Sequence, residues 1–196
     1  MARPNRKEQI FQTALALMRE KGYRNTSMRD IAAAMNMEAP SLYNHISSKE
    51  DLLWQTCTRI AADFEKGLAE VNDIYFGASE KLGMAIRSHI EVLTRDLDAS
   101  YVFVHEWRHL QGELREALIV RRDKYEAAFR EILALGEAEG SFVEADNKFA
   151  LLTILSSLNW VVEWYRPDGD MSPSQIANQL TEFILNGLNK HHNYVR

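Results

Sequence analysis

The pentapeptide HEWRH at residues 105–109 has the residue types and spacing of a zinc hydrolase motif. In such a motif two histidines one helical turn apart bind the metal, and the glutamate beside the first acts as a general base. A catalytic zinc needs a third protein ligand, and Glu113 is in reach only if one helix continues through Gly112. A peptidase also needs an edge strand beside its substrate cleft, and no stretch here alternates as a strand does. We therefore expect polar or solvent contacts for His105 and His109, with a helical metalloprotein or zinc hydrolase as the alternative function.

No second motif supports an enzyme. The chain has no Gly-rich phosphate loop and no nucleophile elbow, and Cys57 has no plausible dyad partner. We expect no catalytic residue, no bound metal and no cofactor. The single cysteine cannot form an internal disulfide, no secretory signal opens the chain, and no apolar run of about 18 residues exists. These features predict a cytoplasmic protein without a membrane span.

Charge divides the chain into a basic head and an acidic body. Residues 1–50 carry eight Lys or Arg against five acids, a net charge of +3, while the other 146 residues carry −8. A basic head predicts contact with a polyanion at that end.

Helical periodicity dominates the sequence of 196 residues and predicts an all-α protein. Capping residues and breakers place the helix ends: Ser27 with Asp30, Asn36, and Ser172 with Gln175. The expected helices cover roughly 6–21, 27–36, 39–46, 49–72, 79–97, 99–111, 113–138, 146–165 and 172–190.

Residues 26–46, TSMRDIAAAMNMEAPSLYNHI, follow a helix-turn-helix pattern with a support helix, a tight turn and a short second helix. Six apolar side chains are expected to form its small core: Ile31, Ala32, Met35, Met37, Leu42 and Ile46. The outward face of the second helix carries slim or polar residues, as entry into a DNA major groove requires: Ala39, Pro40, Ser41, Asn44 and His45.

The segment TSMRDIAAAMNMEAPSLYNHISSKEDLL resembles the DNA-binding part of TetR-family transcription regulators, and the resemblance covers about residues 6–53. It implies that Thr26 and Ser27 meet phosphate at the start of the support helix. It implies that Ala39, Ser41 and Asn44 face bases or the groove floor, and that Tyr43, His45 and Lys49 touch phosphates. Arg29 and Pro40 complete the expected DNA-binding set.

Three positions depart from the family pattern. Asn36 replaces the usual turn glycine, Glu38 replaces a Ser or Thr, and Pro40 replaces a small residue and removes a backbone donor. Base preference is therefore not transferable, and a helical adaptor that has lost DNA binding is a third interpretation. Before this segment, Arg3 and Arg6 either reach DNA or stay solvated.

The last two long helices are predicted to form a dimer interface. KFALLTILSSLNWVVEWY is apolar nearly all round, so it must be covered on more than one side, and IANQLTEFILNGL has an apolar stripe. The resemblance implies a four-helix bundle between two subunits and a palindromic operator. The interface candidates are Leu155, Trp160, Trp164, Leu180, Phe183 and Ile184.

The middle helices are predicted to hold an effector. Residues 106–133 and 159–173 resemble a TetR branch that controls fatty-acid, sterol and aromatic-acid catabolism, which implies an acyl-CoA thioester or another apolar small molecule. The apolar candidates are Phe64, Phe103, Trp107, Tyr125 and Phe129. The candidate phosphate-binding cations are Arg108, Arg121, Arg122 and Arg166.

These observations predict two domains. Residues 1–50 form a three-helix, helix-turn-helix DNA-binding domain, and residues 51–196 form a helical bundle for effector binding and dimerisation. The predicted function is a homodimeric, ligand-responsive transcription regulator, with repression as the expected mode, that binds double-stranded operator DNA and is released by its effector.

Overall fold

The computed structural model describes residues 5–72 and 75–189, and the chain divides into two compact units. The first unit comprises Met1–Ala61 and Asp96–Val120, and the second comprises Ala62–Arg95 and Arg121–Arg196. Within the described ranges every element is helical except one isolated bridge between Phe142 and Asn189. The predicted all-α class is confirmed. No helix among the described residues is long and apolar enough to cross a membrane.

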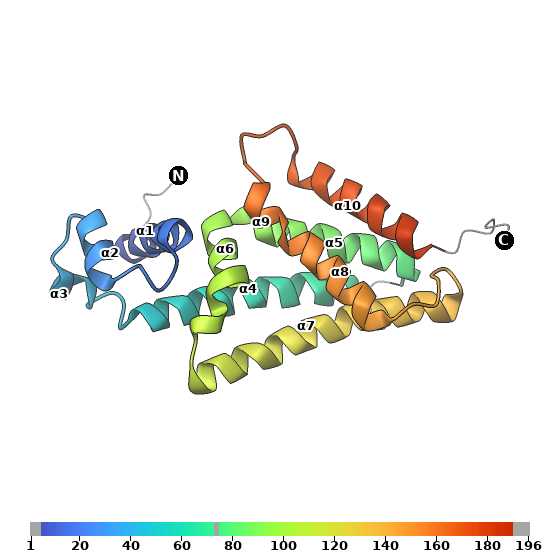
Figure 1. The fold of residues 1–196 in the computed structure, drawn as a ribbon, viewed down its shortest axis with the longest axis horizontal. Coiled ribbons are helices and arrows are strands. Elements are labelled where there is room, and N and C mark those ends of the chain that lie inside the picture. Colours follow the sequence, from blue (N-terminus) through green and yellow to red (C-terminus); the bar gives the residue numbers. More distant parts are fainter. Residues whose placement is uncertain (1–4, 73–74, 190–196) are drawn as a thin grey trace. The chain divides into compact units, whose positions relative to one another are not determined.

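The first unit is built on α1, which lies beside α2 and α6 (Figure 1). The apolar stripe of α1 is buried. Asn5 caps α1 by accepting a hydrogen bond from the Glu8 backbone N–H at 2.9 Å. Ile10, Leu15 and Met18 are fully buried, because α1 packs against both α2 and α6. The elements of this unit are α1 (Arg6–Lys21), α2 (Met28–Ala34), α3 (Ala39–Leu42), the start of α4 (Lys49–Asn72), α6 (Leu97–Glu106), the 3-10 helix η1 (Trp107–His109) and the start of α7 (Gly112–Glu139).

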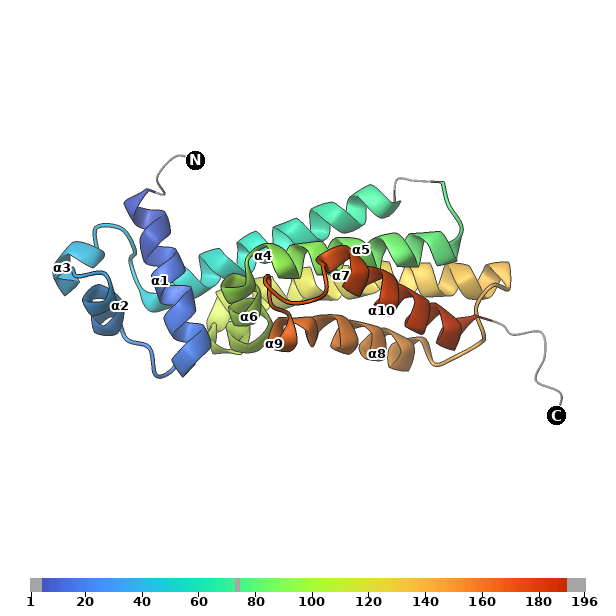
Figure 2. The same cartoon turned by 90° about the horizontal axis from the view of Figure 1, so that it is seen from above.

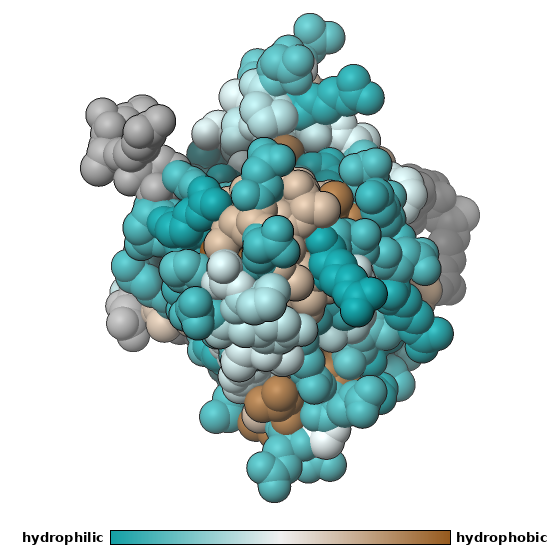
Figure 3. Space-filling view, turned by 90° about the vertical axis from the view of Figure 1, so that its left-hand side faces the viewer, coloured by the Kyte–Doolittle hydropathy of each residue, from teal (hydrophilic) through white to brown (hydrophobic). Residues whose placement is uncertain are grey.

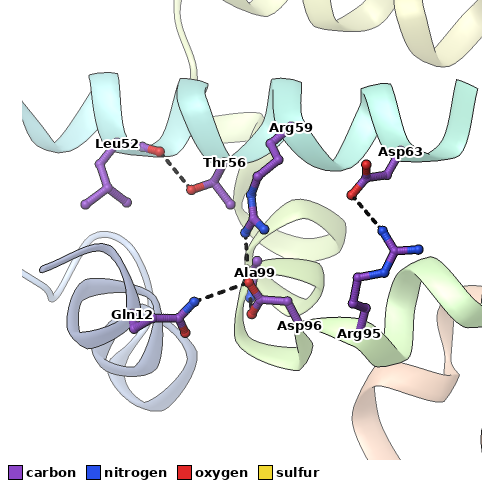
Figure 4. Close-up of polar contacts among 8 residues, drawn as sticks. All are labelled: Gln12, Leu52, Thr56, Arg59, Asp63, Arg95, Asp96 and Ala99. Atoms are coloured by element: carbon purple, nitrogen blue, oxygen red, sulfur yellow. Dashed lines mark hydrogen bonds and ion pairs between the residues drawn. The ribbon is translucent and has the colours of Figure 1, made fainter. Parts of the chain in front are cut away.

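Asp96 joins three helices of the first unit (Figure 4). Its carboxylate caps α6 by accepting from the Ala99 backbone N–H at 3.2 Å. It also accepts from Arg59 of α4 at 2.8 Å and from Gln12 of α1 at 3.4 Å. These bonds fix α6 beside α1 and α4, so α6 belongs to the same rigid unit as the helix-turn-helix.

The second unit is arranged around α5, as Figures 1 and 2 show. The apolar face of α5 is buried against α10, α8 and α9. Gly67 of α4 lets that helix approach α5 closely, because a Cβ at this position would lie 1.9 Å from the Ser88 hydroxyl. The elements of this unit are the remainder of α4 and α7, with α5 (Ala78–Arg95), α8 (Asn147–Asn159), α9 (Val161–Trp164) and α10 (Pro173–Leu188).

The predicted helix bounds were wrong at three places. The helix expected over 39–46 ends at Leu42, because the His45 and Ile46 backbone N–H groups both turn back to the Leu42 carbonyl. The helix expected over 99–111 ends at Glu106 and continues as η1. The helix expected over 146–165 is interrupted at Trp160.

Candidate functional site

The support helix of the helix-turn-helix starts at a complete capping box. The Ser27 hydroxyl accepts from the Asp30 backbone N–H at 3.1 Å, and the Asp30 carboxylate accepts from the Ser27 backbone N–H at 2.7 Å. The bonds from Ser27 lower the pKa of Asp30. Two donors at the start of α2 are satisfied in this way, so a seven-residue helix has a defined beginning.

A left-handed residue makes the turn between α2 and α3. Asn36 has φ of +50°, and the Met37 backbone N–H donates to the Ala32 carbonyl at 2.9 Å. Asn adopts this conformation more readily than other non-glycine residues, so it serves where the family pattern has glycine. The turn places Leu42 and Ile46 in the core with Ile31, where all three are buried.

The outer face of α3 and of the turn that follows it, residues 43–45, is free of large aliphatic side chains. Pro40, Ser41 and Asn44 are exposed, Tyr43 is 54% exposed, and His45 is half-buried. Figure 3 views the molecule from the α2–α3 end and shows mainly hydrophilic side chains there, with a small apolar area among them. Hydrogen-bonding groups on a slim helix face are what major-groove entry requires.

Lys49 ties the start of α4 to the loop that precedes α2. Its ammonium group donates to the carbonyls of Tyr23 at 2.6 Å and Thr26 at 2.8 Å, and lies 4.1 Å from the centre of the Tyr23 ring. Burial lowers the pKa of Lys49. Its donors are thus engaged inside the protein, which gives Lys49 a structural role beside the phosphate contact implied by the resemblance.

Thr26 is also occupied internally. Its side chain is buried, and its hydroxyl donates to the Gly22 carbonyl at 2.9 Å. The hydroxyl thus faces the protein, and the phosphate contact that the resemblance implies for Thr26 stays a prediction. Ser27 and Arg29 are exposed beside it.

The basic N-terminal arm is described only in part. Arg3 lies outside the described residues, while Arg6 is exposed at the start of α1. The Arg6 guanidinium donates to the Met35 carbonyl at 3.4 Å, next to the turn of the helix-turn-helix. A cation is thereby held beside the recognition segment.

The HEWRH motif does not form a two-histidine face. His105 and Glu106 end α6, whereas His109 ends η1, and the tighter 3-10 winding breaks the i, i+4 alignment of an α-helix. His105 packs on the Tyr101 ring at 4.5 Å. His109 lies 3.1 Å from the Glu106 carboxylate and stacks on the Tyr23 ring at 5.1 Å.

Metal binding has no support at this motif. Across residues 5–72 and 75–189, no group of three His, Cys, Asp or Glu side chains is placed to hold a metal ion. The helix expected over 99–111 is corrected by the end of α6 at Glu106. His109 instead links η1 to the loop that carries Tyr23, within the first unit.

The predicted effector residues fall into both units. Phe103, Trp107 and Arg108 belong to the first, where Arg108 lies 4.9 Å from the Trp107 ring. Phe64, Tyr125 and Phe129 meet in the second, with Tyr125 5.3 Å from each phenylalanine ring.

The candidate phosphate-binding arginines of the second unit differ in availability. Arg121 makes a two-pronged ion pair with Glu65, with both N–O distances 2.7 Å, which raises the pKa of Arg121. Its charge is therefore already compensated inside the unit. Arg122 is half-buried and Arg166 is exposed.

Two polar residues of the second unit were missed from the sequence. His89 is buried on α5, with Nδ1 3.0 Å from the Tyr125 hydroxyl and Nε2 3.2 Å from Asn159 Oδ1. The available signal was its place in the apolar stripe of α5 with Ile86 and Leu93. Nothing in the sequence indicated the partner Asn159, which lies 70 residues along the chain.

The predicted dimer residues of the second unit include three exposed aromatic side chains. Trp160 is 63% exposed, Phe183 is 80% exposed and Trp164 is also exposed. Leu155, Leu180 and Ile184 are half-buried. Phe149, 71% exposed on α8, is a further exposed aromatic side chain that was not identified from the sequence. Aromatic side chains so exposed are expected to be covered by another protein surface.

Comparison with known proteins places both parts of the chain. Residues 10–55 match the family described as bacterial regulatory proteins, tetR family, and residues 76–188 match the tetracyclin repressor-like C-terminal domain. The chain is similar to the HTH-type transcriptional repressor KstR2 of Rhodococcus jostii (strain RHA1). Identity is 27% over 193 residues, covering 96% of this chain and 93% of that protein.

Two solved structures share the fold at higher identity. PfmR of Thermus thermophilus, a TetR family transcriptional regulator, is 30% identical with a TM-score of 0.80, covering 92% of this chain and 99% of that one. AibR, solved in complex with isovaleryl coenzyme A and operator DNA, is 31% identical with a TM-score of 0.78, covering 91% and 97%. The helix-turn-helix, the helical second unit and these matches agree, and the chain belongs to the tetR family of bacterial transcription regulators.

Proposed function

We propose that this chain is a homodimeric repressor that binds double-stranded operator DNA through α3 and is released by an acyl-CoA thioester. The alternative effector is another apolar small molecule. The observation that carries the DNA-binding part is the face of α3, where small and polar side chains are exposed over a buried core. The proposed regulator is cytoplasmic, and its dimer presents two such faces. The operator is palindromic because its two half-sites mirror the two-fold symmetry of the dimer.

The proposed DNA contacts divide by chemistry. Ala39, Ser41 and Asn44 face bases, because slim side chains with donors and acceptors suit the major groove. Tyr43, His45 and Pro40 flank them, while Ser27 and Arg29 lie at the exposed start of α2, where phosphate contacts fix orientation. Lys49 contributes by holding the loop before α2 through the Tyr23 and Thr26 carbonyls.

The proposed dimer interface is the apolar face of α8, α9 and α10. Both α8 and α10 pack on α5, so this one helix positions the exposed Trp160 at the end of α8 and the exposed Phe183 on α10. A second copy is the natural cover, because its identical face is equally apolar and a two-fold axis makes the contact self-complementary.

The proposed effector class is supported by AibR, a relative solved with isovaleryl coenzyme A. In this chain the aromatic group of Phe64, Tyr125 and Phe129 offers the apolar lining for an acyl chain. Among the candidate arginines of the second unit, the exposed Arg166 is better placed to meet phosphates than Arg121, whose charge is compensated by Glu65.

Fluorescence anisotropy on the duplex upstream of the protein's own gene tests the DNA and effector proposals together. We expect tight, salt-sensitive binding that an acyl-CoA thioester reverses. Asn44→Asp adds a negative charge to the exposed turn directly after α3 and should abolish binding. Asn178→Asp makes the same charge change beside Arg87 in the second unit and should leave binding intact. Equal affinity of both variants would refute the assignment of α3.

Dimerisation is tested on the same protein. Trp160→Glu places a charge on the apolar face and should yield monomers with weaker operator binding, measured by mass photometry and anisotropy. Tyr75→Glu, at a fully exposed position, is the control and should remain dimeric. A dimeric Trp160→Glu protein would exclude this face as the interface.

A further inference from the structure

A series of side-chain hydrogen bonds crosses the apolar interior of the second unit. His89 is only 2% exposed, and its ring packs against Phe64 with centroids 4.5 Å apart. Its two nitrogens contact the Tyr125 hydroxyl and Asn159 Oδ1 at 3.0 and 3.2 Å. These hydrogen bonds therefore link α5, α7 and α8 through one buried imidazole.

The direction of the hydrogen bonds follows from the partners. Burial lowers the pKa of His89 to about 3, so the ring is neutral and has one donor and one acceptor. Asn159 Oδ1 can only accept, so His89 Nε2–H donates to it. Nδ1 is then the acceptor, and the Tyr125 hydroxyl donates to it. Tyr125 and His89 thus fix the orientation of the Asn159 amide.

This orientation leaves the other end of the amide available. Within residues 5–72 and 75–189, no protein group accepts a hydrogen bond from Asn159 Nδ2, although Oδ1 is engaged, and this nitrogen is open to solvent because it is not among the buried unpaired atoms. Asn159 and Tyr125 are half-buried, whereas His89 is only 2% exposed. An oriented N–H donor is therefore connected, through His89, to the aromatic group formed by Phe64, Tyr125 and Phe129.

We propose that the Asn159 side-chain N–H binds a carbonyl oxygen of the effector, and that His89 and Tyr125 are the positioning residues that aim it. The inference rests on the proposed acyl-CoA response and names the group that is recognised. A carbonyl oxygen accepts but cannot donate, so it complements an amide N–H whose oxygen is already occupied. The apolar rings beside it suit the hydrocarbon that adjoins such a carbonyl.

A purely structural role makes a different prediction. Polar groups buried to brace a core need all their bonds inside the protein, because an unsatisfied donor is costly. Here the bonds end at Asn159, whose second group is left for a partner that is not protein. The carbonyl is either that of the thioester or a second one within the acyl chain, and both present the same oxygen to the amide.

Operator release by three matched compounds tests the proposal. These are a saturated acyl-CoA thioester, the S-alkyl-CoA thioether of the same chain length, which lacks the carbonyl, and the 3-oxoacyl-CoA thioester. We expect the wild-type dimer to need about 10- to 100-fold more thioether than thioester, or than 3-oxoacyl thioester, for half-release. If the thioester carbonyl is bound, both thioesters release operator at lower concentration than the thioether does. If a second carbonyl in the acyl chain is bound, only the 3-oxoacyl compound does so.

The variants separate binding from folding. Asn159→Leu removes the donor, so the three compounds should reach half-release at concentrations within about twofold of one another. Operator affinity without effector should be unchanged. Asn159→Asp keeps the acceptor for His89 but lacks the donor, and should also lose the preference. Tyr125→Phe removes one positioning hydroxyl and should reduce the preference in part, while Tyr75→Phe, at an exposed position, should retain it.

Three results would overturn the inference. Equal half-release of the wild type by all three compounds refutes recognition of a carbonyl and leaves the acyl-CoA effector in place. A preference that survives in both Asn159 variants refutes the assignment to this residue. If no CoA compound releases operator that the wild type binds tightly, the proposed effector class fails and the inference fails with it.

Discussion

Acidification provides a direct test of the buried His89. The neutral ring is stabilised in the folded protein, where burial lowers its pKa from the ordinary 6.5 to about 3. Between these two values the unfolded chain binds a proton that the folded protein does not. Stability contributed by His89 is therefore fully present above pH 6.5 and is lost as pH falls towards 3.

The size of the effect follows from the two pKa values. Between pH 7 and pH 5 almost all the unfolded histidine becomes protonated while the folded ring stays neutral, which costs about 2 kcal/mol of unfolding free energy at 25 °C. The carboxylates with lowered pKa, Asp30 and Asp51, titrate below their ordinary 3.8 and contribute little in this window.

Urea unfolding at the two pH values, at fixed protein concentration because the dimer is concentration-dependent, measures the loss. His89→Gln cannot be protonated but can accept from Tyr125 and donate to Asn159, so its stability should change by about 2 kcal/mol less between the two pH values. His105→Gln, at an exposed position, should change as the wild type does. If His89→Gln and wild type lose the same free energy, the imidazole is not held neutral by burial.

Three further predictions concern the helix-turn-helix. Ser27→Ala removes the capping box and should lower the unfolding free energy by about 1 kcal/mol, measured by urea unfolding, whereas Ser174→Ala, at an exposed position in α10, should have little effect. Asn36→Ala should cost about 1 kcal/mol because φ is +50°, while Asn36→Gly should cost less; equal losses would show that the turn conformation is not the cause. Lys49→Met leaves the Tyr23 and Thr26 carbonyls without their donor, and should lower the melting temperature and weaken operator binding in anisotropy. Unchanged operator affinity would refute a positioning role for Lys49.

The parts of the fold that were predicted correctly depend on local signals. Ser27 with Asp30, and Ser172 with Gln175, each form a capping box within four residues, and both helices start where these pairs predict. Asn36 adopts the left-handed conformation expected of it in the turn. Such features need no knowledge of distant residues, because the bonds that define them close within one helical turn.

The errors arise where long-range contacts decide. No glycine or proline lies between Phe103 and Gln111, so the sequence favours one helix there, yet α6 ends at Glu106. In the structure His109 stacks on Tyr23, a residue 86 positions earlier in the chain. Periodicity cannot register such a partner. The two backbone carbonyls that accept from Lys49 were likewise not indicated by the sequence, because they lie 26 and 23 positions earlier in the chain. The phosphate contact that the resemblance implies for Lys49 stays a prediction.

The HEWRH motif shows why spacing alone is weak grounds for chemistry. Two histidines four apart share a face only while the backbone stays α-helical, and the change to η1 after Glu106 removes that condition. His109 instead connects η1 to the loop before α2, because its ring stacks on Tyr23. The Tyr23 carbonyl in turn accepts a hydrogen bond from Lys49 at the start of α4. A shift of η1 would therefore act first on the loop that leads into α2. The contacts of His109 therefore connect the end of α6 to the loop before α2.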